Sequence, residues 1–168
     1  KNHYLFIDVF QHVQQHAKKK VRAFIIGDGE TKAELLAYAQ QKGLSYAEGA
    51  DKHAALVFTS WIKEVDWALA GLDLVALTSK NEGTPVSLIE AQAAARFIIT
   101  TNVGGIKDIL HPDCGFLSEA DDADTYKTNL LKAVTHFDTL NAQAGVASEE
   151  VIQKFGYPRL CNDVAQLY

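Results

Sequence analysis

The order of strand-like and helix-like segments is the feature of this 168-residue chain that most limits its fold. Short apolar runs typical of buried strands alternate with stretches whose apolar residues recur at helical spacing. The strand-like runs are 21–26, 55–58, 74–77, 97–100 and 115–117, and the helix-like stretches are 2–13, 31–42, 65–72, 85–95, 106–110 and most of the chain after Asp122, with breaks near Gly145, Gly156 and Pro158. Strands joined by helices pair in parallel, with the helices on both faces of the sheet. We therefore expect an α/β fold, formed as a single domain over residues 1–168.

The stretch 79–91 carries the strongest chemical signal. It follows the strand-like run 74–77, and parallel sheets bind their ligands beyond the carboxyl ends of the strands. Thr84 is a good N-cap and Pro85 suits the first helical position, so we expect a helix to begin here. The first N–H groups of this helix would be free to bind an anion such as a phosphate, and they are those of Val86 and Ser87.

Two carboxylates bracket this helix start. Glu82 precedes the turn, and Glu90 lies five residues beyond Pro85, which is roughly 7–8 Å along a helix axis. A diphosphate bound at the helix start would leave one acid near each end of a sugar nucleotide. The pattern is therefore typical of a nucleotide-sugar site.

The segment 77–109 resembles the signature of the retaining glycosyltransferases with two Rossmann-like domains, the GT-B enzymes of the glycosyl transferases group 1 family. In that family two glutamates with seven residues between them mark the donor site, as Glu82 and Glu90 do here. Further resemblances are the Gly-Asp-Gly turn 27–29, the Thr-Asn-Val-Gly-Gly loop 101–105 and the opening Lys-Asn. The resemblance covers the whole chain. It implies a Rossmann-like parallel sheet with helices on both faces, forming one half of a GT-B enzyme.

The resemblance also implies a role for each residue of the site. Glu90 would accept hydrogen bonds from the ribose hydroxyls. Glu82 would face the transferred sugar as the catalytic residue, positioning the donor and stabilising charge rather than acting as a general base. The remaining donor-binding candidates are Lys1, Gly27, Gly29, Trp61, Gly83, Thr84, Pro85, Val86 and Ser87. The simpler interpretations are a solvated acid near a helix start for Glu90 and a turn-stabilising acid for Glu82.

Several of these candidates have equally simple structural interpretations. In the family a Lys at the position of Lys1, together with an upstream Arg, neutralises the donor diphosphate, but that Arg and its strand are not in this sequence. Gly-Asp-Gly after a strand is also an ordinary turn, so Gly27 and Gly29 need not touch a ligand. The ring of Trp61 is expected either to pack on the nucleotide base or to lie partly buried under its loop.

Two positions depart from the family pattern. Ala95-Arg96-Phe97 replaces the usual Gly-x-Pro after the signature helix, and Ser60 replaces a common Gly. If the helix keeps a left-handed cap, the loss of its glycine costs on the order of 1 kcal/mol. These positions are expected to affect local stability more than chemistry.

Charge and hydropathy exclude other classes of protein. The formal net charge of −5 argues against a nucleic-acid-binding surface. No apolar run approaches the ~18 residues of a membrane span. The basic run 18–20 with Arg22 leaves a membrane-surface role open, although cations at the end of a helix also complement its dipole.

The cysteines and histidines give weaker signals. Cys114 and Cys161 lie far apart and outside any metal spacing, which favours reduced thiols in a cytoplasmic protein. His12 and His16 stand one helical turn apart, as metal ligands do. No further ligand is placed to complete a metal shell, so a solvent-facing pair fits better.

The sequence therefore predicts the donor-binding domain of a retaining glycosyltransferase of the hexosyltransferase type, active in polysaccharide biosynthesis. Its substrates would be a nucleotide-sugar, most simply a UDP-sugar, and a glycan or lipid-linked acceptor. The resemblance implies no metal and no other cofactor.

The domain's first strand and an N-terminal acceptor domain would precede Lys1, so we expect this chain alone to be inactive. The full enzyme would be cytoplasmic, with peripheral association at the inner face of the membrane left open. The alternative function is a non-catalytic nucleotide-binding or regulatory module with the same fold.

Overall fold

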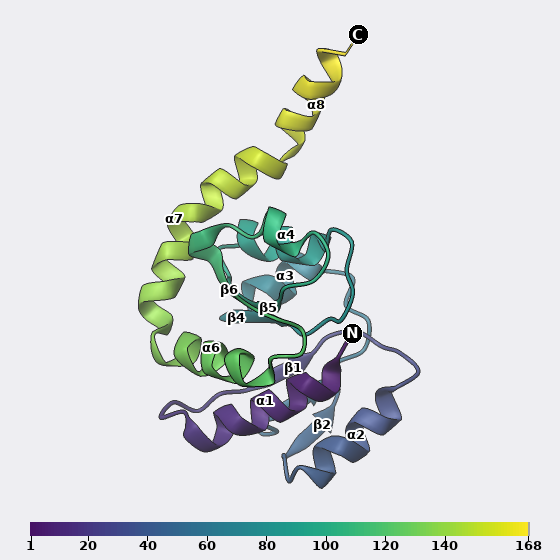
Figure 1. The fold of residues 1–168 in the computed structure, drawn as a ribbon. Helices are drawn as coiled ribbons and strands as arrows, with labels where there is room; N and C mark the ends of the chain where they lie inside the picture. Colours follow the sequence, from purple (N-terminus) through teal and green to yellow (C-terminus); the bar gives the residue numbers. More distant parts are fainter. Residues whose placement is uncertain (168) are drawn as a thin grey trace.

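The structure is a computed structural model that describes residues 1–167, in which helices alternate with short strands (Figure 1). The strands are β1 (Ala23–Ile25), β2 (Tyr46–Glu48), β3 (Leu56–Phe58), β4 (Leu74–Leu77), β5 (Phe97–Thr101) and β6 (Gly115–Ser118). The helices are α1 (His3–His16), α2 (Lys32–Gln41), α3 (Val65–Ala70), α4 (Val86–Ala93), α5 (Ile106–Ile109), the 3-10 helix η1 (Pro112–Cys114), α6 (Ala123–Thr135), α7 (Phe137–Phe155) and α8 (Tyr157–Ala165). The expected α/β fold is confirmed.

The recorded strand pairings are all parallel, but the strands form two three-stranded sheets rather than one continuous sheet. β3 lies between β1 and β2, and β5 lies between β4 and β6. β1 and β4 therefore each keep one unpaired edge. The sequence does not predict β2, because its residues, Tyr-Ala-Glu, form no apolar run and none of them is buried.

The core lies on both faces of β5, which is buried along its whole length. Phe97 and Ile99 pack on one face with residues of α1, α6 and α7. Ile98 packs on the other face with residues of α3, α4 and α5. Each fully buried side chain of this kind contributes about 1.5–3 kcal/mol. β5 is therefore the buried central strand of its sheet, and its packing holds in place the loop that follows its carboxyl end.

The C-terminal end of α4 keeps a left-handed cap without a glycine. Ala95 has a φ of +58° and donates its N–H to the Gln92 carbonyl at 2.9 Å, while the Arg96 N–H bonds to the Ala91 carbonyl at 2.9 Å. These are the two hydrogen bonds of a Schellman motif. α2 ends in the same motif with a glycine, Gly43, at a φ of +71°. The departure from the family pattern at Ala95 thus leaves the cap in place.

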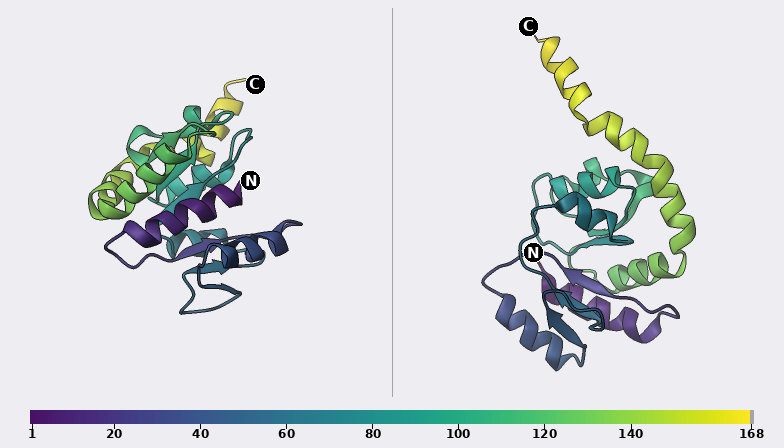
Figure 2. Two further views of the ribbon diagram at one scale, coloured as in Figure 1. Left: turned by 60° about the horizontal axis from the view of Figure 1, so that its bottom comes forward. Right: turned by 180° about the vertical axis from the view of Figure 1, so that it is seen from behind.

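The chain ends in three consecutive helices. α6 and α7 meet at His136, and Gly145 lies inside α7, so the expected break at Gly145 is wrong. Gly156 separates α7 from α8 as expected, and a Cβ there would lie 2.4 Å from the Ile152 carbonyl oxygen. α8 has no buried residue and points away from the rest of the chain (Figures 1 and 2). Within residues 1–167, no helix is both long and apolar enough to cross a membrane.

Candidate functional site

The signature helix, α4, begins one residue later than the sequence indicates. Pro85 is the N-cap, with an extended ψ of 104°, and Thr84 lies outside the helix, so the prediction of Thr84 as the cap is wrong. The Gly105 N–H donates to the Gly83 carbonyl at 3.0 Å, which holds the chain before Pro85 in this extended path. The Leu88 N–H donates to the Pro85 carbonyl at 3.0 Å, whereas the N–H groups of Val86 and Ser87 have no carbonyl of their own helix to bind. Two backbone donors are therefore open at this end of α4.

A cavity of about 600 Å³ lies between β1 and β4 and reaches the carboxyl ends of both strands. Its interior is mainly apolar. Among its lining residues are predicted donor-binding residues, namely Lys1, Gly27, Gly29, Trp61, Ser87 and Glu90. The others do not line this cavity and form the adjacent loop and helix start, namely Glu82, Gly83, Thr84, Pro85 and Val86.

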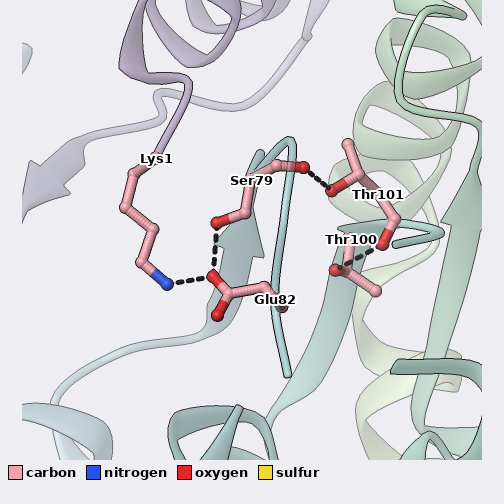
Figure 3. A network of polar contacts seen from close by, with 5 residues as sticks. All are labelled: Lys1, Ser79, Glu82, Thr100 and Thr101. Atoms are coloured by element: carbon pink, nitrogen blue, oxygen red, sulfur yellow. Dashed lines mark hydrogen bonds and ion pairs between the residues drawn. The ribbon is translucent and has the colours of Figure 1, made fainter. Parts of the chain in front are cut away.

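Two donors hold the carboxylate of Glu82 (Figure 3). The Lys1 ammonium forms an ion pair with Oε1, and the Ser79 hydroxyl donates to the same oxygen at 2.6 Å. The Glu82 side chain is only 13% exposed. Burial raises the pKa of Glu82, but the hydrogen bonds from Lys1 and Ser79 outweigh it and bring the pKa below its ordinary value of 4.5. Glu82 is therefore ionised at neutral pH and fixed in orientation.

The residues that position Glu82 were not predicted from the sequence. Ser79 is fully buried, and its carbonyl accepts a hydrogen bond of 2.6 Å from the hydroxyl of Thr101, the last residue of β5 (Figure 3). The Thr100 hydroxyl donates in turn to the Thr101 carbonyl at 3.2 Å. The available signal is that hydroxyl residues stand at the carboxyl ends of two neighbouring apolar strands. These hydroxyls donate to the Glu82 carboxylate and to two backbone carbonyls, and thereby link the Glu82 loop to β5.

The second glycine loop braces the backbone at Glu82. Gly104 has a φ of +57°, and a Cβ at this position would lie 1.8 Å from the Glu82 carbonyl oxygen. A Cβ at Gly105 would lie 3.1 Å from the Gly83 carbonyl oxygen. Only glycine at position 104 allows the two loops to approach this closely. The motif at 101–105 therefore has a structural role beside the acid.

The Gly-Asp-Gly turn is tied to the loop after β3. Asp28 accepts hydrogen bonds from the Gly29 N–H at 2.9 Å and from the Ser60 hydroxyl at 3.1 Å. The Gly29 N–H, followed by the Ser60 hydroxyl, lowers the pKa of Asp28. Gly27 has a φ of +119°, which favours glycine, and Cβ atoms at Gly27 and Gly29 would meet nothing within 4 Å. Ser60 thus makes a contact that a glycine would lack, and open space remains over the turn.

Trp61 and Glu90 both extend into solvent beside the cavity. The Trp61 side chain is 81% exposed, so the interpretation of a Trp partly buried under its loop is wrong. Glu90 is exposed on α4, and among residues 1–167 no recorded hydrogen bond or ion pair engages its side chain. Each side chain can therefore contact a ligand without losing an internal partner.

Comparison with known proteins identifies the family. A model of the family described as Glycosyl transferases group 1 matches residues 1–136. The UDP-Gal:alpha-D-GlcNAc-diphosphoundecaprenol alpha-1,3-galactosyltransferase of Escherichia coli is 26% identical over 145 residues, which are 86% of this chain and 35% of that protein. The Vi polysaccharide biosynthesis protein VipC/TviE of Salmonella typhi is 30% identical over 141 residues, which are 83% of this chain and 22% of that protein. The chain thus spans well under half of the curated relatives that it matches.

Solved structures show the same fold. HepE of Anabaena in complex with UDP has a TM-score of 0.83 at 20% identity, covering 99% of this chain and 44% of HepE. The C-terminal domain of LpcC, a glycosyl transferase group 1 family protein of Francisella tularensis, has a TM-score of 0.74 at 21% identity, covering 92% of this chain and 79% of that domain's chain. The fold is thus the Rossmann-like half of GT-B glycosyltransferases. Because the family model also matches most of its length, the chain belongs to the Glycosyl transferases group 1 family.

Proposed function

We propose that this chain is the donor-binding domain of a retaining glycosyltransferase that transfers a sugar from a UDP-sugar to a glycan or lipid-linked acceptor. One observation carries the proposal. An immobilised, ionised acid, Glu82, and an unengaged acid, Glu90, flank the open N-terminal end of α4 beside a cavity. A ligand with a diphosphate between two hydroxyl-bearing rings matches this arrangement.

The names of similar proteins support a UDP-sugar donor. The Escherichia coli relative is named for UDP-Gal, and its named acceptor carries diphosphoundecaprenol, a lipid. HepE has been solved with UDP and with UDP-glucose. In our proposal the full protein would use the same class of donor, with a lipid-linked or glycan acceptor bound by a further domain.

The N-terminal end of α4 would receive the diphosphate. The N–H groups of Val86 and Ser87 carry the positive end of the helix dipole. Lys1 lines the same cavity as Ser87 while pairing with Glu82. The Lys1 ammonium could therefore pair with Glu82 before a ligand binds and also neutralise the diphosphate of a bound donor.

The two acids would divide the remaining contacts. Glu82, held by Ser79 and braced by Gly104, would orient the transferred sugar in a fixed electrostatic field. Glu90 would accept hydrogen bonds from the ribose hydroxyls, and the exposed Trp61 ring would pack on the base. Transfer with retention would take place on one face of the donor, without a protein nucleophile.

Calorimetric titration with UDP and with a panel of UDP-sugars tests this division. Glu90→Ala should weaken UDP and the cognate UDP-sugar alike, roughly ten- to a hundredfold, because both ligands carry the ribose. Glu82→Ala should leave UDP affinity unchanged and remove the extra affinity that the sugar supplies. Glu149→Ala, which removes an exposed acid on α7, is the matched control and should change neither affinity.

The same titrations distinguish the proposed function from the alternative, a non-catalytic nucleotide-binding or regulatory module. Equal losses of UDP affinity in Glu82→Ala and Glu90→Ala would contradict the division of roles. A non-catalytic nucleotide-binding module would bind UDP without any gain from an attached sugar. That module would also leave Glu82→Ala indistinguishable from the unmodified chain with every ligand.

A further inference from the structure

The loops that follow β1 and β3 leave the first sheet side by side. Ile25 and Phe58, the last residues of these two strands, are direct partners in the parallel ladder. Just beyond them, the Thr59 N–H donates to the Ile25 carbonyl at 3.0 Å, and the Thr59 hydroxyl donates to the same carbonyl at 3.3 Å. The Gly-Asp-Gly turn after β1 and the loop after β3 therefore begin at a fixed separation.

One hydrogen bond joins these two loops further from the sheet. The Ser60 hydroxyl donates to Oδ2 of Asp28 at 3.1 Å, while Oδ1 of Asp28 accepts from the Gly29 N–H at 2.9 Å. Each carboxylate oxygen of Asp28 thus has its own donor, one from each loop. A glycine at position 60 would have no side chain with which to form the bond between the loops.

The loop after β3 has few other polar ties. Within residues 1–167, the only other recorded hydrogen bond of the segment 60–62 is the one that the Thr59 hydroxyl donates to the Ser60 carbonyl. Trp61 follows Ser60 directly, and its side chain is largely exposed, so packing does little to fix its ring. The position of the indole therefore depends on how firmly the backbone at Ser60 is held.

The two joined loops border the same space. Trp61, Gly27 and Gly29 all line the cavity, and a Cβ at either glycine would meet nothing within 4 Å. A planar ring bound in this space can contact the glycine turn and the indole together only while the two loops keep their separation. The hydrogen bond between Ser60 and Asp28 sets that separation beyond the end of the sheet.

We propose that Ser60 and Asp28 are positioning residues that hold Trp61 ready for the base of the bound nucleotide, an inference that rests on the proposed function. Neither residue needs to touch the donor. Their hydrogen bond orders the loop before a ligand arrives, so less loop and side-chain entropy is lost when the base binds. Without the bond, the ligand itself would have to order the loop.

The first test measures the motion of the indole without any ligand. A Trp67→Phe background leaves Trp61 as the only tryptophan, and time-resolved fluorescence anisotropy reports how freely its ring moves. Ser60→Ala should enlarge the fast component of the anisotropy decay, whereas Ser60→Thr, which keeps a hydroxyl, should not. Ser45→Ala is the matched control, because the Ser45 hydroxyl accepts from the Ala55 N–H at the amino ends of β2 and β3. Equal indole motion in Ser60→Ala and the unmodified background would overturn the proposal.

Calorimetric titration then separates a local effect from a general one. Ser60→Ala should weaken UDP about three- to tenfold and leave the affinity for inorganic pyrophosphate, which carries no base, unchanged. Asp28→Ala should show the same split. The double variant should lose no more than the weaker of the two single variants, because each removes the same hydrogen bond. Equal losses for UDP and pyrophosphate would show that Ser60 supports the whole domain and would overturn the proposal.

A Trp61→Ala background tests whether Ser60 acts through the indole. In that background Ser60→Ala should cause no further loss of UDP affinity, and an undiminished loss would overturn the proposal. Failure of the unmodified chain to bind UDP would contradict the proposed function, while the anisotropy of the ligand-free chain would still decide whether Ser60 holds Trp61. UDP binding that Ser60→Ala leaves unchanged would keep the proposed function and overturn the role of Ser60.

Discussion

At Glu82, a buried serine and an exposed lysine share the same carboxylate oxygen. The Lys1 side chain is 48% exposed, and exposed ion pairs contribute little because solvent and salt screen them. Ser79 is fully buried and its carbonyl is anchored by Thr101. A hydrogen bond from a buried hydroxyl to a charged group contributes about 1.5–3 kcal/mol. The hydrogen bond from Ser79 should therefore stabilise the Glu82 carboxylate more than the ion pair with Lys1 does.

Ser79→Ala should raise the pKa of Glu82 and lower stability in a pH-dependent way. The lowered pKa of Glu82 stabilises the folded chain above its ordinary pKa of 4.5, and this contribution is lost as pH falls through the folded-state pKa. The variant should therefore have its largest deficit in Tm near neutral pH, and the deficit should narrow at acid pH. Scanning calorimetry across this pH range measures it.

Thr100→Val is the control for that comparison. It removes a buried hydroxyl of the same network whose recorded hydrogen bond goes to the Thr101 carbonyl rather than to Glu82. Its deficit in Tm should be the same at neutral and acid pH. A pH-independent deficit for Ser79→Ala would show that Ser79 stabilises the fold without acting on Glu82.

At the scale of helices and strands, the sequence predicts those elements whose formation depends mainly on local residue patterns. The unbroken apolar runs predict β4 and most of β5, and Glu82 precedes α4 while Glu90 lies within it. The sequence misjudges α7, because a glycine inside a helix costs only about 1 kcal/mol relative to alanine. Burial of Ala144, Ala147 and Val151 on that helix offsets this cost. Ser79 stands only three residues before Glu82, but its anchoring by Thr101 joins residues 22 positions apart and could not be predicted from local patterns.

At the end of α4, Ala95→Gly should stabilise the chain. Ala95 holds a φ of +58°, which penalises a side chain but not glycine. Relief of this strain should raise the free energy of unfolding by about 1 kcal/mol, although the greater conformational entropy of glycine in the unfolded chain offsets part of the gain. The corresponding rise in Tm is about 2–4 °C. Gly43→Ala supplies the reciprocal control, because Gly43 ends α2 in the same motif and its Cβ would meet nothing within 4 Å. If Gly43→Ala destabilises while Ala95→Gly changes nothing, the Ala95 methyl group must contribute packing that offsets the strain.

At the scale of the whole molecule, the C-terminal arm carries exposed apolar side chains. Leu160, Val164 and Leu167 are 51%, 46% and 80% exposed on the arm formed by α8 and the residues after it, which leaves the body of the domain (Figure 1). The chain also spans only 22–39% of the length of its curated relatives. Both observations are consistent with the function proposed above, in which a further domain binds the acceptor.

The chain alone should therefore transfer no sugar, even where it binds a donor. The predicted contacts at Glu82, Glu90 and the start of α4 all address the nucleotide-sugar, and none of the sequence motifs is assigned to an acceptor. The assay supplies UDP-, GDP- and ADP-sugars with glycan and lipid-linked acceptors, and uses a longer form of the protein with the acceptor-binding half as the positive control. The Glu82→Ala variant of that longer form sets the background. Transfer by the chain alone above this background would show that residues 1–168 also hold the acceptor, and would contradict the division of the enzyme into donor and acceptor halves.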